Sequence, residues 1–270
     1  MRIDLHIHST ASDGSLSPAA VAATARDGGL HVIAIADHDT TAGVAAASAA
    51  ATGHVHVVPA VELSTYGDGA ELHMLGYFID PFNPSLLAHG RRASGAREHR
   101  MHEMLDRLAA AGVSVSFGDV LAAAGTRPES IGRPHLARAL VQRGHVGSVS
   151  EAFDRFIGDQ GPAFVPSALI TPFEAIEIIH QAGGVAVWAH PRPDLLQTLL
   201  PPLTAHGIDG VECYRPRLSH AETERISAIA AGAGLFITGG SDWHGDWQGR
   251  LGDFAVERDD VAAFLEVGGI

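Results

Sequence analysis

The chain has 270 residues, of which 46% are hydrophobic, and a formal net charge of −13 at pH 7. This length is enough for one sizeable α/β core, so a second full domain is not required. The acidic balance argues against broad electrostatic binding to nucleic acid. The single cysteine, Cys213, excludes a disulfide within the chain and a thiolate-rich zinc cluster, and we interpret it as a small apolar residue in a strand.

The chain starts with a predicted strand rather than with a targeting segment. Met1 precedes this strand almost directly, without a charged leader, an apolar segment and a cleavage site. In addition, no apolar run is long enough to span a bilayer. A cytoplasmic protein that does not bind membranes is therefore expected.

Strand and helix patterns alternate over the first 80 residues. The short apolar runs are typical of buried parallel strands. Ser17-Pro18 and Gly28-Gly29 are start and stop signals for the helix between the first two strands. The predicted elements are a strand over 3–7, this helix, a strand over 32–36, a helix over 42–51, and strands over 55–61 and 72–79.

This regular alternation stops near residue 80 and returns near residue 170. The intervening stretch predicts helices separated by Gly and Pro, over 86–111, 118–124, 134–143 and 151–157. We interpret residues 81–165 as a helical insertion that caps the substrate. Residues 1–80 and 166–270 would then form the main domain.

Two capping boxes mark helix starts in the last hundred residues, Thr171 with Glu174 and Ser219 with Glu222. The elements predicted here are a helix ending at Gly183-Gly184, a strand over 185–189, a helix over 194–206, a strand over 208–214, a helix ending at Gly234 and a strand over 235–238. About seven strands are therefore expected. The pattern indicates an α/β fold, either a parallel barrel or an open sheet.

Histidines and carboxylates gather at the ends of the apolar runs. They occur in Asp4-Leu5-His6-Ile7-His8, Asp37-His38-Asp39, Glu62, His73, His190-Pro191 and Asp242-Trp243-His244. Because side chains alternate along a strand, His6 and His8 project together, while Leu5 and Ile7 face the opposite layer. Burying imidazoles and ionised carboxylates side by side is costly unless a cation organises them. The sequence therefore predicts a multinuclear metal site at the carboxyl ends of the strands.

All 18 basic residues are arginine, and ten of them lie between residues 85 and 165. Arginine can bind phosphate with two parallel hydrogen bonds, although codon bias and solvated helix faces also explain such a distribution. Arg133 lies in a Gly and Pro loop between helices, which is a good place to present a side chain. Arg97 and Arg100 share a helix face, which a solvated surface explains at least as well.

Other polar residues have weaker patterns. Tyr214 and His220 follow a predicted strand and are expected at the pocket wall, as on any barrel rim. Asp37 and Asp39 either hydrogen-bond a ligand histidine or cap the next helix. The remaining histidines are assigned to surface or loop, among them His31, His54, His56, His89, His145, His180 and His206.

The ordered motifs resemble those of the PHP (polymerase and histidinol phosphatase) superfamily. The set includes Asp13-Gly14, His-Met-Leu-Gly-Tyr around His73, and Gly240-Ser241-Asp242-Trp243-His244-Gly245, and it spans nearly the whole chain. Within this superfamily the chain most resembles the nucleotide phosphatases and 5′→3′ exoribonucleases. The resemblance implies a distorted (β/α)7 barrel with a helical insertion and three divalent metal ions.

The resemblance also implies a role for each motif. One metal would be held by His6, His8, Glu62 and Asp242, a second by Glu62, His73 and His190, and a third by Asp13, His38 and His244. Arg133 and His135, in Gly-Arg-Pro-His, would face the substrate. Imidazole and carboxylate ligands suit Mn, Fe or Zn without selecting one. We favour Mn, with Fe or Zn as alternatives.

These expectations converge on a metal-dependent phosphoesterase. A metal-bound hydroxide would attack a phosphate monoester of a nucleotide, such as a 3′,5′-nucleotide bisphosphate, or a short 5′-phosphorylated oligonucleotide, but not a long duplex. His38, His135 and Asp242 would act in catalysis, with His135 as a candidate proton donor to the leaving group. The expected substrate contacts are Arg97, Arg100, Arg133, His135, Tyr214 and His220.

Three other activities fit part of the same pattern. A histidinol phosphate phosphatase would use the same metals, although the helical insertion favours nucleotides. A non-catalytic metal-binding PHP module is disfavoured by the complete ligand set. An amidohydrolase that acts on C–N bonds shares the barrel and the metals, and an arginine positioned to bind phosphate is the feature against it.

Overall fold

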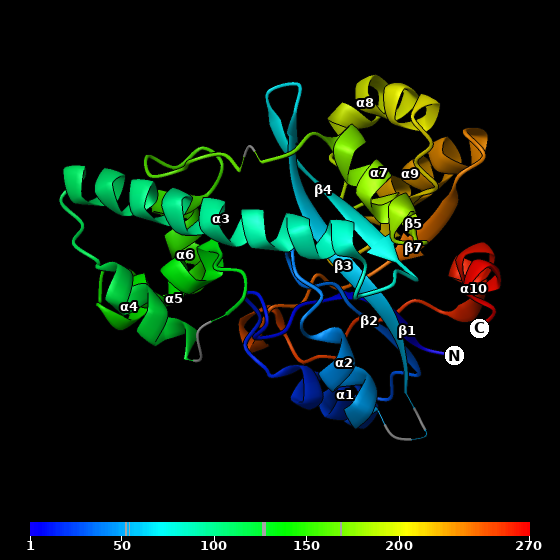
Figure 1. Cartoon of the computed structure of the whole chain (residues 1–270), viewed down its shortest axis with the longest axis horizontal. Coiled ribbons are helices and arrows are strands. Elements are labelled where there is room, and N and C mark those ends of the chain that lie inside the picture. Colours follow the sequence, from blue (N-terminus) through cyan, green and yellow to red (C-terminus); the bar gives the residue numbers. More distant parts are fainter. Residues whose placement is uncertain (52, 54, 126–127, 168) are drawn as a thin grey trace.

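The computed structural model describes residues 1–51, 53, 55–125, 128–167 and 169–270 (Figure 1). His54, which the sequence assigned to surface or loop, lies outside the described residues, and so does Arg127 of the arginine-rich stretch. Within the described residues, the model contains no helix that combines the length and the apolar character needed to cross a bilayer.

Seven strands form one sheet in chain order, and they are β1 (Ile3–Ile7), β2 (Val32–Ile35), β3 (His56–Gly67), β4 (Ala70–Tyr77), β5 (Val185–Trp188), β6 (Gly210–Tyr214) and β7 (Phe236–Gly239). All neighbouring strands pair in parallel except β4, which is antiparallel to β3 and β5. After β7 the chain returns to β1, because the His8 N–H donates to the Trp243 carbonyl at 2.9 Å. The predicted distorted (β/α)7 barrel is confirmed.

The β3–β4 hairpin causes the distortion. The sequence predicted a strand over 55–61, but β3 continues to Gly67, and Asp68-Gly69 forms a two-residue turn in which both φ angles are positive. Asp-Gly suits such a turn, which forces the two strands to run antiparallel. Ser64 therefore pairs with His73. The start of β4 thus lies at the barrel edge where the neighbouring strands end.

The helices outside the barrel begin where the sequence signals predict. They are α1 (Pro18–Asp27), α2 (Val44–Ala50), α7 (Pro172–Gln181), α8 (Pro193–Ala205) and α9 (His220–Gly232). Ser17 caps α1, and both predicted capping boxes are present at α7 and α9. Cys213 is buried in β6, where burial raises the pKa of its thiol to about 12. Its interpretation as an apolar strand residue is confirmed.

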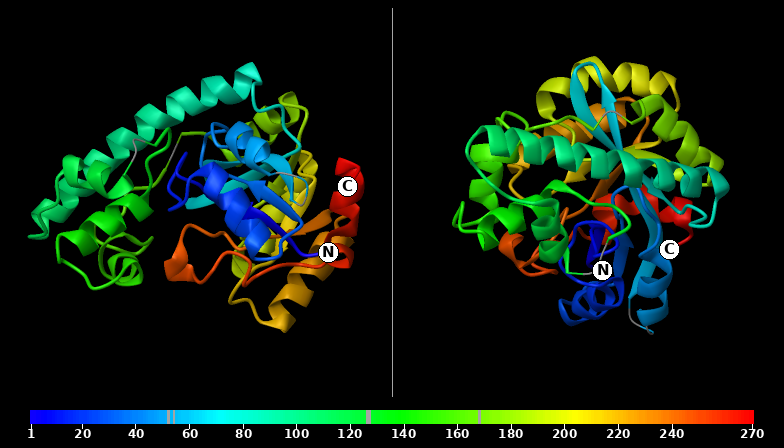
Figure 2. Two further views of the ribbon diagram at one scale, coloured as in Figure 1. Left: turned by 90° about the horizontal axis from the view of Figure 1, so that it is seen from below. Right: turned by 60° about the vertical axis from the view of Figure 1, so that its left-hand side comes forward.

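The arginine-rich stretch is helical, as predicted, and consists of α3 (Pro84–Ala110), α4 (Phe117–Ala124), α5 (Arg133–Gln142), α6 (Val149–Ala152) and a π-helical turn (Phe153–Ile157). The first half of α3 crosses the barrel, and its second half extends beyond it to α4, α5 and α6 (Figures 1 and 2). Residues between Met101 and Val165 form a hydrophobic cluster of their own. The π-helical turn replaces the end of the predicted helix over 151–157.

The sequence analysis missed the C-terminal helix α10 (Ala262–Gly268) and two short 3-10 helices, Asp246–Gln248 and Arg258–Val261. Phe264 of α10 is fully buried, and its ring packs on Tyr77, Phe78 and Phe236. These contacts connect the helix to the end of β4 and to β7. Both termini lie on the side of the barrel away from α4, α5 and α6 (Figure 2).

We expect Phe264→Ala to lower the free energy of unfolding by about 3–5 kcal/mol, because it opens a cavity among three aromatic rings. Urea unfolding monitored by circular dichroism measures this change. Val267→Ala on the same helix is the control, since Val267 is 54% exposed and should change stability by less than about 0.5 kcal/mol. Equal urea midpoints for the two variants would contradict the packing described.

Candidate metal centre

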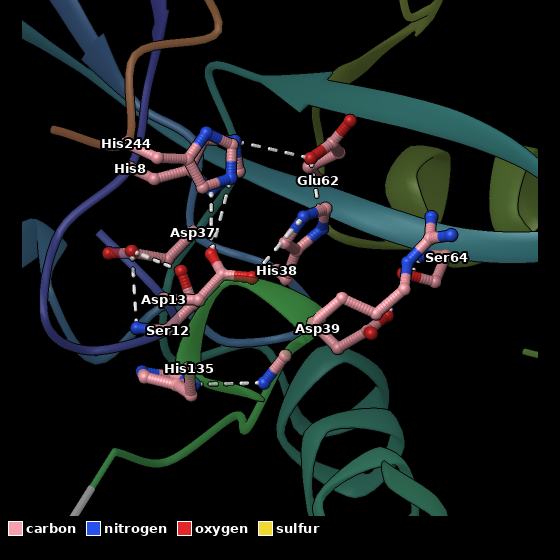
Figure 3. Close-up of polar contacts among 12 residues, drawn as sticks. His8, Ser12, Asp13, Asp37, His38, Asp39, Glu62, Ser64, His135 and His244 are labelled. Carbon is pink, nitrogen blue, oxygen red and sulfur yellow. Dashed lines mark hydrogen bonds and ion pairs between the residues drawn. The ribbon is translucent and has the colours of Figure 1, made fainter. Parts of the chain in front are cut away.

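The structure brings all the expected metal ligands together at one edge of the barrel. They form three groups whose ligand atoms lie within 4.8 Å of one another, which are His6, His8, Glu62 and Asp242; His8, Asp13, His38 and His244; and His38, Glu62 and His73. His190 joins the third group, because its Nε2 lies 3.0 Å from Glu62 Oε1 and 3.2 Å from His73 Nδ1. Figure 3 shows His8 and His244 above Asp13, with Glu62 and His38 beside them.

The free atoms of these side chains fit divalent cations. Glu62 Oε2, His6 Nε2, both ring nitrogens of His8, Asp13 Oδ1 and His38 Nδ1 are buried without a hydrogen-bond partner. Buried polar atoms normally have partners, so a cluster of unsatisfied polar atoms is costly. Imidazole nitrogens and carboxylate oxygens without thiolate form the donor set of Mn, Fe or Zn sites. The residues present therefore fit bound divalent metal ions.

Glu62 lies at the centre of the cluster. Its Oε2 is 2.9 Å from His38 Nδ1 and 3.3 Å from His8 Nε2, and its Oε1 is 2.9 Å from His73 Nδ1. Burial by itself would raise the pKa of this carboxyl, but the surrounding imidazoles lower it well below its usual range. These contacts favour the ionised form of Glu62, which is the form that a bridging metal ligand would need.

β1 directs two histidines to the cluster in spite of a register irregularity between Asp4 and Ile7. His6 and His8 are fully buried, and their ring centroids lie 5.1 Å apart, so they project together as expected. Leu5 and Ile7 were expected on one opposite layer, but they pack into two different hydrophobic clusters. The two histidines therefore still point to the same side of the strand, whereas Leu5 and Ile7 do not share one apolar layer.

The sequence analysis missed Glu212, which accepts hydrogen bonds from two candidate ligands. Its Oε1 accepts a hydrogen bond from His6 Nδ1 at 2.9 Å, and its Oε2 accepts one from the His190 N–H at 2.7 Å. The Nε2 of His6 is thereby left with a free lone pair that faces Glu62 and Asp242. A carboxylate within an apolar strand was the sequence signal that could have identified Glu212.

Backbone constraints also hold the ligands in place. His190 and Asp242 have positive φ angles, of 31° and 52°, which non-glycine residues rarely adopt. Such strained positions cluster at functional sites. Gly240 approaches β1 so closely that a Cβ there would lie 2.2 Å from the Cβ of His6. The segment after β7 is therefore pressed against the first ligand strand.

Asp37 and Asp39 support the neighbouring loops. The Asp37 carboxylate accepts hydrogen bonds from the hydroxyls of Ser9 and Ser12, both at 2.7 Å, and so shapes the loop that carries Asp13 (Figure 3). Asp39 accepts hydrogen bonds from Arg97 Nε at 2.7 Å and from the Ser64 N–H at 3.0 Å. Neither aspartate has a ligand histidine as a partner or caps α2, whose N-cap is Gly43. Both sequence interpretations are therefore corrected.

A cavity of about 270 Å³ opens over the ligands, and Arg97, Arg100 and Arg133 line it, as the sequence suggested. Arg97 is 6% exposed, and its guanidinium also donates to Ser64 Oγ at 2.6 Å. Arg100 and Arg133 both contact the carboxylate of Glu71, at 3.2 and 3.5 Å. The arginines are thus at the cavity, but each already has an anionic partner.

His135 lies close to the cavity without lining it. Its ring is 1% exposed, and Nδ1 accepts a hydrogen bond from the Gly132 N–H at 3.0 Å, which caps α5. Burial lowers the pKa of His135 to about 4. The ring is thus occupied as a buried cap of α5, and a role of His135 as proton donor stays a prediction.

Three further residues are placed differently from the sequence expectation. His220 begins α9, where its side chain is 89% exposed and pairs with Glu224 on the same helix. Tyr214 packs against the hydrophobic clusters of the barrel. Neither side chain lines the cavity above the ligands. His89, assigned to surface or loop, is fully buried in α3, where its Nε2 lies 2.9 Å from Asp39 Oδ1.

Known proteins of similar sequence cover nearly the whole chain. A 5′-3′ exoribonuclease from Haemophilus influenzae is 35% identical over 249 residues, which are 90% of each protein. A 3′,5′-nucleoside bisphosphate phosphatase from Chromobacterium violaceum is 34% identical over 92% of this chain and 88% of its own length. The chain belongs to the PHP superfamily. No family model matches it.

Solved structures agree with this assignment. An amidohydrolase from Chromobacterium violaceum, crystallised with sulfate and no metal, superposes with a TM-score of 0.88 at 31% identity over 95% of this chain and 92% of its own. A candidate metal-dependent phosphoesterase from Bifidobacterium adolescentis gives 0.87 at 33% identity over 97% and 95%. This PHP protein is a metal-dependent phosphoric ester hydrolase.

We expect Glu212→Gln to weaken metal binding by about 10- to 100-fold, because it removes the charged partner that orients His6. Calorimetric titration of the metal-depleted protein with Mn²⁺ measures the affinity. Glu224→Gln, on the exposed face of α9, should leave it unchanged. An affinity for Mn²⁺ that is equal in both variants would remove Glu212 from the metal centre.

We expect Arg97→Met to lower the free energy of unfolding by about 3–5 kcal/mol, because it leaves the buried carboxylate of Asp39 without its charged partner. Chemical denaturation is the measurement. The matched control is Arg91→Met, an exposed position on the same helix. Unchanged stability of Arg97→Met with a higher KM would instead support the substrate contact that the sequence predicted.

Proposed function

We propose that this chain hydrolyses phosphate monoesters of nucleotides, such as 3′,5′-nucleoside bisphosphates, or short 5′-phosphorylated oligonucleotides. The observation that supports this most is the convergence of buried, unpartnered imidazole and carboxylate atoms from distant parts of the chain at one cavity. The names of the two curated relatives support the nucleotide substrate.

We further propose that His6, His8, Asp13, His38, Glu62, His73, His190, Asp242 and His244 hold three divalent ions, with Mn favoured. Bound ions of this kind supply Lewis acidity, activate water and offset the charge that develops on phosphate oxygens. The residues of the chain position these groups. His244, for example, has Nδ1 2.9 Å from the Asp242 carbonyl, which leaves Nε2 directed at Asp13.

Residues 81–165 form the cap over this centre in our proposal. Arg133 presents its guanidinium at the cavity between the rings of Phe153 and Phe164, 5.8 and 5.3 Å from their centroids. Such rings hold a guanidinium in place while its N–H groups remain available to an anion. A phosphate that enters the cavity would compete for Arg133 with Asp159 and Glu71, whose carboxylates lie 2.7 and 3.5 Å from its guanidinium.

We expect His6→Ala and Asp242→Ala to abolish phosphate release and to lower the metal content, because each removes a ligand of the same group. Elemental analysis and a phosphate-release assay over nucleoside bisphosphates and 5′-phosphorylated oligonucleotides of increasing length provide the two readouts. Histidinol phosphate is the comparison substrate. Activity retained by both variants would refute the ligand assignment, and preferential hydrolysis of histidinol phosphate would refute the nucleotide substrate.

We expect Arg133→Ala to reduce kcat/KM by about 10- to 100-fold with the metals still bound, because one charge-assisted hydrogen bond to phosphate is lost. Steady-state kinetics and elemental analysis test this together. Arg143→Ala, at the exposed end of α5, is the control and should match the unsubstituted protein. Loss of metal in Arg133→Ala would show that its role is structural instead.

A further inference from the structure

Asp13 lies where the barrel meets the proposed cap. It is 1% exposed in the loop between β1 and α1, and its Oδ1 is 3.3 Å from His244 Nε2 and lacks a hydrogen-bond partner. Its Oδ2 lies 3.9 Å from His38 Nε2. Figure 3 shows Asp13 below His8 and His244 and above His135 of the cap. This candidate ligand therefore has barrel residues on one side and the cap on the other.

The cap holds the loop of Asp13 through the backbone of that loop. The carbonyl of Ala11 accepts hydrogen bonds from the N–H groups of Glu129 and Ser130, at 3.0 and 3.3 Å. The carbonyl of Asp13 accepts one from Arg138 Nη1 at 3.2 Å. The position of this loop therefore depends on the cap as well as on the barrel.

Gly132, the N-cap residue of α5, packs directly against the Asp13 carboxylate. A Cβ at Gly132 would lie 2.1 Å from Asp13 Oδ2 and 3.0 Å from its Cγ. The backbone of Gly132 is extended, with φ of −136° and ψ of 171°, and other residues adopt this conformation readily. The glycine is therefore required by the neighbouring carboxylate and not by its own backbone conformation.

Buried contacts keep Gly132 in this place. Its N–H donates to His135 Nδ1 at 3.0 Å, and the preceding carbonyl, of Ile131, accepts a hydrogen bond from Arg97 Nη1 at 3.2 Å. His135 and Arg97 are 1% and 6% exposed, and Arg97 forms an ion pair with a carboxylate of the barrel. A side chain at position 132 would therefore displace the Asp13 carboxylate more readily than it would displace the cap.

We propose that residues 129–138 of the cap are positioning residues for the metal centre. They hold the Asp13 carboxylate toward His38 and His244, and so set the affinity for the ion that we assign to these three residues. This inference rests on the proposed function, because the ions are those proposed there. Arg133, which we propose to bind phosphate, directly follows Gly132, so one segment serves both the ion and the substrate.

The effect of this segment is expected at one ion only. Glu212 of β6 accepts hydrogen bonds from His6 and His190, which we assign to the other two ions. These two ligands are therefore held within the barrel and keep their places when the contact between Asp13 and the cap is weakened. The metal content should then fall by one ion per chain and not to zero.

Gly132→Ala should lower the affinity for one of the three ions by about 10- to 100-fold, because the added methyl group displaces the Asp13 carboxylate. Equilibrium dialysis against Mn²⁺ followed by elemental analysis counts the ions per chain at each concentration. The matched control is Gly95→Ala in α3, where a Cβ would meet open space among the described residues. Unchanged affinities in Gly132→Ala, or an equal loss of all three ions, would overturn the proposal.

A variant without added bulk provides an independent test. Arg138→Met removes the hydrogen bond to the Asp13 carbonyl and keeps an apolar stem, so it should weaken binding of the same ion. Arg143→Met, at the exposed end of α5, is its control. In Gly132→Ala and Arg138→Met, phosphate release should recover at higher Mn²⁺ concentration, because mass action fills a weakened site. A loss of activity that saturating Mn²⁺ does not restore would show a purely structural role and overturn the proposal.

Metal content separates this proposal from the proposed function. If the unsubstituted protein binds three ions but hydrolyses no nucleotide, the proposed function fails, and selective loss of one ion in Gly132→Ala still supports the role of the cap. If nucleotides are hydrolysed and both cap variants keep three ions with unchanged affinities, the proposed function stands and the cap does not position Asp13.

Discussion

The structure depends on one electrostatic constraint, the burial of the Glu62 carboxylate among imidazole rings. His6, His8, His38, His73 and His190 all approach this carboxylate within 3.4 Å. An ionised acid among ring nitrogens, several of them without hydrogen-bond partners, is expensive to bury by itself. Divalent cations remove the cost, and so folding of this edge of the barrel and metal binding are linked. The strands that carry these residues must therefore bring them to the same level along the barrel axis.

The strands differ in how they meet that requirement. Parallel strands bring their carboxyl ends together by topology, which places His38 and His190 at the same edge of the barrel. β4 runs the opposite way and contributes its beginning instead, through the hairpin turn at Asp68-Gly69. Glu212 then accepts hydrogen bonds from two candidate ligands, His6 of β1 and His190 just after β5. The centre thus combines a general property of barrels with local devices specific to this chain.

Sequence reasoning succeeded where local signals decide the structure. The caps of α1, α7 and α9 follow from short-range hydrogen bonding, and the strand limits follow from apolar runs with β-branched residues. The ordered ligand motifs were likewise visible as residues. The limits of β3, the direction of β4 and the helix α10 were not, because they depend on pairing and packing between distant segments.

The roles of individual polar side chains were harder to predict for the same reason. Arg97 is an attractive phosphate ligand in the sequence, but its partner Asp39 is distant along the chain and becomes its neighbour only in the fold. His135 was expected to face the substrate, and its side chain is buried and caps α5.

The hairpin between β3 and β4 also limits how the gene can change. Side chains alternate between the two faces of a strand, so a single codon inserted or deleted within the start of β4 would turn His73 away from the other ligands. Changes of two codons would preserve its facing and move it along the edge. Length variation among descendants of this chain should therefore be tolerated in the turn itself and be selected against between the turn and His73.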